Sequence, residues 1–241
     1  MKKCYAIKKG FDFETGEEVK GFIVYNWSEC AKLVQGVKGA QYKSFTNKED
    51  AIRYLEDKQV TMCDNNILQV YVDGSYRAED KKYSYGIVAV RNNVIEFIEY
   101  DMFNDISGIR QVAGELKGAL RGVSYAKSIN EPRVAIFHDY AGVANHIDGT
   151  WKTTNETSIF YNKFMKNLME GISVDFIKVD GHTGNLYNEL VDDVCKYPLG
   201  IKSTNVMKKW LKDNKICVKN EELRNLVHEI TNSDINNIVI K

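Results

Sequence analysis

Four carboxylates in the chain have the settings expected of metal ligands. Asp73 and Asp139 each follow an apolar run, and such runs are typical of strands that are buried on both faces. Glu115 lies among apolar residues in a helical pattern, and Asp192 lies in a later helical pattern one turn beyond Asn188. Because neighbouring strand ends converge in an open α/β sheet, we expect these acids to share one site.

The chemistry of this acidic set is that of a hard divalent cation. Carboxylates that are brought together repel one another, and a cation between them removes the repulsion. Oxygen ligands with no His or Cys set nearby indicate magnesium or manganese rather than zinc. Each acid also has an ordinary explanation, since Asp73 precedes a glycine as turn residues do, while Glu115 and Asp192 fit solvated helix faces. The prediction therefore depends on the set, not on any single residue.

The segment that carries these acids predicts an α/β fold. Residues 67–72 form a nearly continuous apolar run that ends at Asp73-Gly74, and β-like runs at 83–91 and 94–100 flank an Asn-Asn pair that suits a tight hairpin. The elements expected after them are a helix at 109–128, a strand at 134–137, a short helix, a helix at 157–169, a strand at 174–179 and a last helix. This order predicts a mixed five-stranded sheet with helices on both faces.

The segments before and after the acidic segment are expected to fold as separate units. Residues 1–56 predict a small α+β domain of a three-stranded sheet and two helices, and residues 57–66, polar and without periodicity, are the expected linker. The acidic segment would then form a domain at 67–200. The pattern at 201–241 predicts an extension of two amphipathic helices, to which we assign no function. We expect these helices to pack on the acidic domain or on each other rather than to bind a partner.

Composition limits the classes of function. The 44% hydrophobic and 27% charged content is typical of a globular protein, and no run approaches the ~20 apolar residues that span a bilayer. No apolar stretch follows the lysines at the N-terminus, so we expect a cytoplasmic protein with no membrane contact. No obligate protein partner is evident from the sequence. The net charge is zero, but the charges are unevenly distributed. Residues 61–198 are acidic, and the segments before and after them are basic. A cation-binding core with phosphate-binding attachments has this pattern, and so do solvated charged faces.

The five cysteines are far apart in the sequence and form no CxxC pair. This spacing argues against a disulfide framework and against a zinc site. We therefore expect free thiols with no role beyond packing.

Five short motifs follow one another between residues 73 and 192. They are Asp73-Gly74-Ser75, Ala113-Gly114-Glu115, His138-Asp139, His182-Thr183-Gly184 and Asn188-Glu189-Leu190-Val191-Asp192. In this order they resemble the type 1 ribonuclease H family over about residues 68–198. That family's catalytic domain opens on Asp-Gly-Ser, carries a glutamate in its first helix and closes with a His-x-Gly loop before Asn-Glu-x-x-Asp. The resemblance implies a ribonuclease H-like fold for this segment.

The resemblance also implies a reaction, the hydrolysis of the RNA strand of RNA–DNA hybrids with two Mg²⁺ or Mn²⁺ ions. Asp73 would bridge both ions, and Asp192 would hold the ion that activates the attacking water. Glu115 and Asp139 would hold the ion at the leaving oxygen, and the products would carry 5′-phosphate and 3′-hydroxyl ends.

Further site residues follow from the same motifs. The backbone near Gly74 and Ser75, with Glu115, would read ribose 2′-hydroxyls, and Asn188 would also contact the nucleic acid. His182 would assist proton transfer or product release, although a lone loop histidine also fits a surface position. Asp193 competes with its neighbour for the ligand role, and we prefer Asp192 because its spacing fits the family pattern.

The chain departs from familiar members of the family in three places. His138 stands where Ser, Thr or Tyr is frequent, and the long helix opens on Arg110-Gln111 instead of Arg-Asn. No basic protrusion appears between residues 144 and 155. We therefore expect substrate affinity to come from another part of the chain.

Aromatic residues and lysines near the N-terminus offer such a surface. Tyr5, Trp27 and the pair Tyr42-Lys43 resemble the hybrid-binding domain of cellular type 1 ribonucleases H, which also occurs in viroplasmin, over about residues 3–56. The resemblance implies that rings pack on deoxyribose while an ammonium meets phosphate. Trp27 also fits a core anchor. Ser44 replaces a second lysine of the motif, and the loop at 11–20 is longer and more acidic than in relatives.

Two other functions stay open. A non-catalytic binder of RNA–DNA hybrids or double-stranded RNA would keep the aromatic and basic residues but would not need all four acids. Another nuclease of the ribonuclease H-like superfamily, such as an exonuclease or resolvase, would keep the acids. The Asp-Gly-Ser motif and the N-terminal hybrid-binding motif disfavour it.

Overall fold

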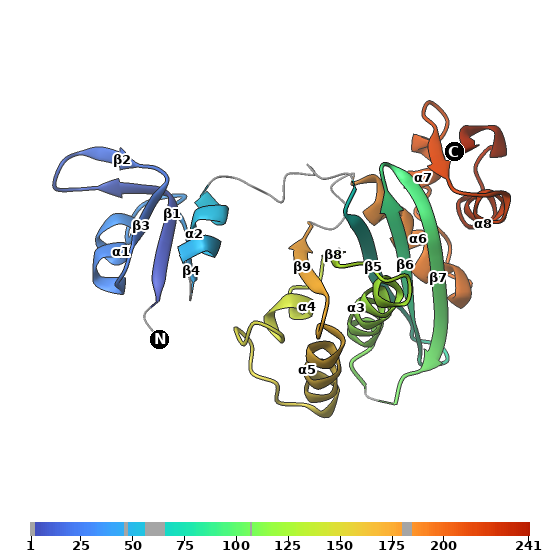
Figure 1. The fold of residues 1–241 in the computed structure, drawn as a ribbon, viewed down its shortest axis with the longest axis horizontal. Coiled ribbons are helices and arrows are strands. Elements are labelled where there is room, and N and C mark those ends of the chain that lie inside the picture. The colour runs from blue at the N-terminus through green and yellow to red at the C-terminus, as the bar shows by residue number, and fades with distance from the viewer. Residues whose placement is uncertain (1–2, 46–47, 56–65, 107, 180–184) are drawn as a thin grey trace. The chain divides into compact units, whose positions relative to one another are not determined.

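The computed structural model describes residues 3–45, 48–55, 66–106, 108–179 and 185–241. The chain divides into two compact units, residues 1–64 and 65–241, which are described separately below (Figure 1). The expected linker at 57–66 lies outside the described residues, apart from Asn66.

The N-terminal unit is an antiparallel sheet with two helices. Its elements are β1 (Cys4–Asp12), β2 (Glu17–Val19), β3 (Phe22–Val24), α1 (Trp27–Val34), β4 (Gln41–Phe45) and α2 (Lys48–Leu55). Strand β1 pairs with the other three strands. The sheet thus has four strands rather than three, because part of the expected loop at 11–20 forms a hairpin in which Gly10 lies opposite Val19. The Asn26 side chain caps α1 by accepting from Glu29 N at 2.8 Å.

The larger unit is built on a seven-stranded mixed sheet in the order β11-β10-β7-β6-β5-β8-β9. Its central elements are β5 (Leu68–Arg77), β6 (Lys82–Arg91), β7 (Val94–Asn104), α3 (Gln111–Ser128), β8 (Arg133–His138), α4 (Gly142–Asn145), α5 (Glu156–Leu168), β9 (Ser173–Lys178), α6 (Leu186–Lys196) and η1 (Tyr197–Leu199). Strands β5, β6 and β7 are antiparallel, whereas β8 and β9 continue the sheet in parallel with β5. Asn92 and Asn93 form the predicted hairpin turn, both with positive φ.

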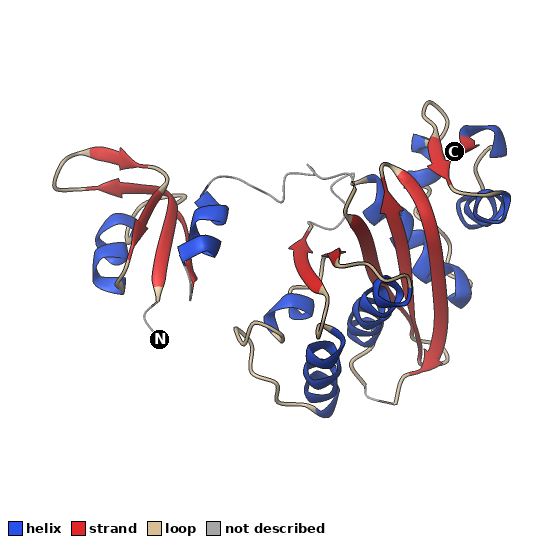
Figure 2. Cartoon of the chain, viewed as in Figure 1, coloured by secondary structure: helices blue, strands red, loops and turns tan. Residues whose placement is uncertain are grey.

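Helices lie on both faces of this sheet (Figure 2). Two apolar clusters, one on each face, form the core between the sheet and these helices. Alternate residues of β5 divide between them, since Tyr71 packs with α6 on one face while Val70 and Val72 pack with α3 and α5 on the other. The predicted fold class, a mixed sheet with helices on both faces, is therefore confirmed. Within the described residues, no helix combines the length and apolar character that crossing a bilayer requires.

The expectation of five strands is wrong, because the C-terminal segment adds two. This segment contains α7 (Val206–Trp210), β10 (Ile216–Val218), α8 (Glu221–Thr231), η2 (Ile235–Asn237) and β11 (Ile238–Ile240). Strand β10 pairs in parallel with β7, and β11 pairs in parallel with β10. Both expected helices are present, and Met207 and Val227 join the core on the α6 face. Residues 201–241 are thus not purely helical.

Candidate active site

Parallel pairing of β5 and β8 sets two aspartates side by side. Tyr71 lies opposite Phe137 in the register, and Asp73 and Asp139 each follow two residues later. The prediction that the first strand ends at Asp73 is wrong, because β5 continues to Arg77 along β6. Asp139 lies beyond the end of β8, where the chain leaves the sheet.

Helix α3 brings Glu115 to these aspartates through a close contact with the sheet. The structure leaves no room for a side chain at Gly114, where a Cβ would lie 2.0 Å from the Ser84 carbonyl oxygen and 2.8 Å from Gly74 Cα. Because the two backbones can approach this closely, carboxylate oxygens of Asp73, Glu115 and Asp139 lie within 4.8 Å of one another. Glu115 is only 5% exposed.

Helix α6 brings the fourth acid from the other face of the sheet. Asn185 caps α6, and Gly86 on β6 lets the helix approach, since a Cβ there would lie 2.8 Å from Cys195 N. Asp192 supplies a ligand atom within 4.8 Å of Asp73. Its Oδ2 also accepts from Lys196 Nζ at 2.6 Å.

Asp193, the alternative ligand of the sequence prediction, has different surroundings. It is buried, and the side chain that bonds to its carboxylate is that of Ser203 rather than another acid of the cavity. Burial, followed by the nearby charge of Asp192, raises the pKa of Asp193 to about 6. Of the two neighbours, Asp192 is the one grouped with Asp73.

The acids are held in an environment that penalises negative charge. Burial raises the pKa of Asp73 to about 7, and the charges of Asp139 and Asp192 add to the shift. A hydrogen bond with the Glu115 side chain and one from Gly74 N at 2.7 Å oppose it. Burial and the charge of Asp73 also raise the pKa of Glu115 well above its usual value. Oε2 of Glu115 is buried with no hydrogen-bond partner among the described residues. A divalent cation fits this set, because it would compensate the charges and give that oxygen a partner.

The four acids line one cavity of about 870 Å³. The predicted residues Gly74, Ser75 and Asn188 line it as well, whereas His182 lies outside the described residues. Cationic side chains share the lining, namely Lys81, Arg110 and Lys196. The sequence prediction missed the contribution of Lys196, although its spacing of four residues from Asp192 in a helix was a usable signal.

His138, the departure next to Asp139, has a structural role. It is fully buried, and its Nδ1 donates to the Tyr140 carbonyl oxygen at 2.9 Å. Burial lowers the pKa of His138 to about 4, so the ring stays neutral at physiological pH. The bond ties the end of β8 to the turn from which Asp139 projects.

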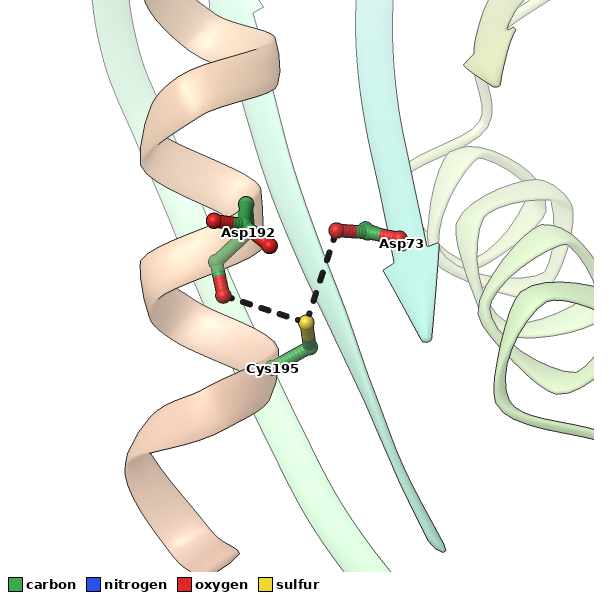
Figure 3. Close-up of side chains that lie close together, drawn as sticks. All are labelled: Asp73, Asp192 and Cys195. Atoms are coloured by element: carbon green, nitrogen blue, oxygen red, sulfur yellow. Dashed lines mark hydrogen bonds between the residues drawn. The ribbon is translucent and has the colours of Figure 1, made fainter. Parts of the chain in front are cut away.

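A thiol lies next to two of the acids, although Cys195 is not among the residues that line the cavity, and the sequence had indicated no set of His or Cys residues near them. Cys195 Sγ lies 3.5 Å from Asp73 Oδ2 and 3.2 Å from the Asp192 carbonyl oxygen (Figure 3). Cys195, like Cys30 and Cys217, is a free thiol. The expectation of free thiols is met for these three, and the Cys195 thiol contacts the Asp73 carboxylate and the Asp192 carbonyl group.

In the N-terminal unit, three of the predicted binding residues form one aromatic cluster. The Trp27 ring lies 5.6 Å from the ring of Tyr5 and 5.8 Å from that of Tyr42. Trp27 and Tyr42 are each 43% exposed, so Trp27 is not a buried core anchor. Lys43 follows Tyr42 in β4 and therefore faces the other side of the sheet, where its Nζ lies 5.8 Å from the Phe45 ring.

Comparisons with known proteins agree with both units. A family model described as the ribonuclease H1 N-terminal domain matches residues 3–55, and one described as RNase H matches residues 65–200. A search of curated proteins found no match.

Several solved structures are similar to the chain. RNase H1 from the archaeon Halobacterium salinarum aligns with 17% identity and a TM-score of 0.48, over 55% of this chain and 97% of its own. The N-terminal RNase H domain of a Mycobacterium tuberculosis protein aligns with 16% identity and a TM-score of 0.46, again over 55% and 97%. LC11-RNase H1, solved with an RNA/DNA hybrid, aligns with 12% identity and a TM-score of 0.46, over 55% and 99%. Because the RNase H family model spans more than half of the sequence, the chain belongs to the ribonuclease H family.

Proposed function

We propose that this ribonuclease H is an endonuclease that hydrolyses the RNA strand of RNA–DNA hybrids with two divalent cations, Mg²⁺ or Mn²⁺. The observation that carries the proposal is the buried Glu115 oxygen without a hydrogen-bond partner among the described residues, beside three more carboxylates in one cavity. A protein that only bound nucleic acid would gain nothing from burying acids that repel phosphate.

The proposed ligands divide between two ions. Asp73 would serve both, Asp192 would complete one position, and Glu115 with Asp139 would complete the other. Such a pair of ions stabilises the attacking and leaving oxygens of an in-line displacement at phosphorus, which would leave 5′-phosphate and 3′-hydroxyl ends.

The protein's other contribution would be to hold the scissile strand. The Gly74 and Ser75 backbone and the Asn188 side chain line the cavity, where they can contact ribose hydroxyls. Arg110 and Lys81 line the same cavity and provide positive charge for phosphates. We propose that His182 assists proton transfer or product release.

We further propose that the N-terminal unit retains the hybrid. In the cluster of Tyr5, Trp27 and Tyr42, the rings of Trp27 and Tyr42 are exposed and of the kind that pack on sugars, while Tyr5 supports Trp27 from the core side. Lys43 lies on the other face of the sheet, so the rings rather than this lysine would form the centre of the contact. The domain boundaries implied by this division are 1–56 and 67–200, with residues 201–241 as an extension.

One assay tests the proposal. Full-length protein is incubated with end-labelled RNA–DNA, RNA–RNA and DNA–DNA duplexes in Mg²⁺, in Mn²⁺ and in excess chelator. We expect internal cuts in the RNA of the hybrid only, no cuts in chelator, and product ends that polynucleotide kinase can label only after phosphatase treatment.

Other outcomes point to the alternatives. Hybrid binding with no cleavage in either metal would favour the non-catalytic binder. Equal cleavage of duplex DNA, or removal of single nucleotides from one end, would favour another ribonuclease H-like nuclease. Asp73→Asn serves as the inactive control, because the amide keeps the shape of the side chain and removes its charge.

A further inference from the structure

A second cavity lies within the N-terminal unit, between helix α1 and the hairpin of β1 and β2 (Figure 1). Its volume is about 380 Å³, and the surface that it exposes is mainly apolar. The apolar residues that line it are Phe13 in the hairpin turn, Phe22 and Val24 on β3, and Leu33 on α1. We call this cavity the hairpin groove. The proposed hybrid contact uses none of its residues.

Two phenylalanines of the hairpin groove are unusually exposed. Phe13 is 64% exposed, and Phe22 is 54% exposed. The ring of Phe13 lies 5.1 Å from that of Phe11 in an edge-on arrangement, which holds it in place beside the groove. Large apolar side chains gathered around a surface cavity are typical of a protein interaction site, because a complex removes them from water.

The polar residues of the hairpin groove determine which partner fits. Three carboxylates line it, those of Asp12, Glu14 and Glu29, against the single ammonium of Lys32. Lys32 Nζ is itself 3.8 Å from a Glu14 oxygen, so the groove keeps an excess of negative charge. This charge repels phosphate and attracts a partner that carries lysine or arginine.

The hairpin groove and the aromatic cluster lie on different sides of α1. Residues of an α-helix are rotated by about 100° from one to the next, so Glu29, Lys32 and Leu33 share one side and Trp27 lies on the other. The strands agree with this division. Tyr5 on β1 pairs with a β3 residue and with a β4 residue, so β3 and β4 flank β1 on opposite edges. Strand β3 contributes to the groove, whereas β4 carries Tyr42 of the aromatic cluster.

We propose that the hairpin groove binds a segment of a partner protein in which one large apolar side chain stands between lysines or arginines. The apolar side chain would pack on Phe13 and Phe22, and the cations would pair with Glu14 and Glu29. Because the aromatic cluster is on the other side of α1, the N-terminal unit would hold the partner and a hybrid at the same time. Docking of the partner does not depend on the proposed function, whereas simultaneous binding of a hybrid does.

The first experiment selects peptides from a random library displayed on phage, with immobilised full-length protein as the target. The library is first depleted on a variant that combines Phe13→Ser with Glu29→Lys, two changes at exposed side chains, whose fold is checked by circular dichroism. We expect the enriched peptides to share an apolar residue flanked by lysine or arginine. No enrichment after depletion, or enriched peptides without basic residues, would overturn the proposal.

The second experiment measures the dissociation constant of the best peptide by fluorescence polarisation. Phe13→Ser and Glu29→Lys, each alone in the full-length chain, should raise Kd at least about tenfold, as loss of a central contact does. Phe160→Ser is the matched control, because Phe160 is 52% exposed but lies on α5 of the other unit. Added salt should weaken binding to the wild type, since it screens exposed charges. A groove variant that binds like the wild type, or an equal loss in Phe160→Ser, would refute the assignment of the groove.

The last measurement adds saturating RNA–DNA hybrid to the complex of protein and labelled peptide. We expect Kd for the peptide to stay the same, and Trp27→Ala to weaken hybrid binding but not peptide binding. Displacement of the peptide by the hybrid would mean that the two surfaces are not separate. If the wild type does not bind the hybrid, the proposed function fails, while the peptide measurements still decide whether the groove is a docking site.

Discussion

Gly114→Ala tests whether backbone contact between α3 and the sheet builds the active site. The added Cβ would lie 2.0 Å from the Ser84 carbonyl oxygen, well inside the 3.4 Å at which ordinary contact begins. Both obstructing groups, the Ser84 carbonyl and Gly74 Cα, are backbone, so no rotamer change can relieve the clash. The helix must move away from the sheet by about 1 Å or more, and Glu115, the next residue, must move with it.

The expected magnitude combines two opposing effects. Overpacking of this kind costs ~1–3 kcal/mol or somewhat more, and the better helix propensity of alanine returns ~1 kcal/mol. We expect a net loss of about 2 kcal/mol, which for a domain of this size lowers Tm by roughly 4–8 °C. A displacement of ~1 Å at a catalytic group reduces the rate by about a hundredfold.

Gly118→Ala is the matched control, because it lies one turn further along the same helix. There the nearest atoms to a Cβ are Val72 Cβ at 3.3 Å and the Gly86 carbonyl oxygen at 3.4 Å, a tight but tolerable fit. Thermal melts and single-turnover cleavage of a hybrid are measured for both variants. If Gly114→Ala melts and cuts like Gly118→Ala, the close contact is not what positions Glu115.

Three further predictions concern the acids and the aromatic cluster. Because the folded-state pKa of Asp73 is raised to about 7, the native protein binds more protons than the unfolded chain between about pH 4 and pH 7. The free energy of unfolding of the metal-free protein should therefore fall as the pH rises through that range. Thermal melts should show a lower Tm at pH 8 than at pH 5, and Mn²⁺ should restore the Tm at pH 8. Asp192→Asn should reduce the cleavage rate at least ~100-fold more than Asp193→Asn, since a lost charge clamp costs several kcal/mol, and the reverse order would mean that Asp193 is the ligand. Trp27→Ala should raise the hybrid concentration needed for half-maximal rate, with little change in the single-turnover rate at saturation. Lys43→Ala should raise that concentration by less, and an equal rise would mean that the lysine shares the contact.

The order of the five motifs made it predictable from the sequence that the four acids lie in one cavity. Asp73 and Asp139 each follow an apolar run, and parallel pairing of such strands can only bring their ends together. The sequence could not show that Asp73 lies within a strand, because pairing of residues 73–77 with β6 depends on a partner that is distant in the chain.

Residues without a periodic or spaced pattern escaped prediction. Cys195 is an isolated cysteine with no second cysteine near it in the sequence, so only the packing of α6 against β5 reveals that its sulfur reaches Asp73. The prediction also failed to separate Lys43 from the aromatic cluster. Neighbours in sequence were assumed to share a surface, whereas alternate residues of a strand point to opposite faces.

The strands of the C-terminal segment were missed because each is only three residues long. An apolar triplet carries too little alternation to distinguish a strand from a turn of helix. Their place in the sheet depends on pairing with β7, which no local signal encodes.

The pairing of β10 with β7 has a consequence for how the protein is made. During translation β7 emerges and can pair with β6 long before Ile216, the first residue of β10, leaves the ribosome. Until then the backbone of Val94 and Ile95 forms an open sheet edge, which is a template for strands of other nascent chains. The nuclease unit therefore passes through a stage at which misassembly competes with folding, and translation speed between β7 and β10 sets how long that stage lasts.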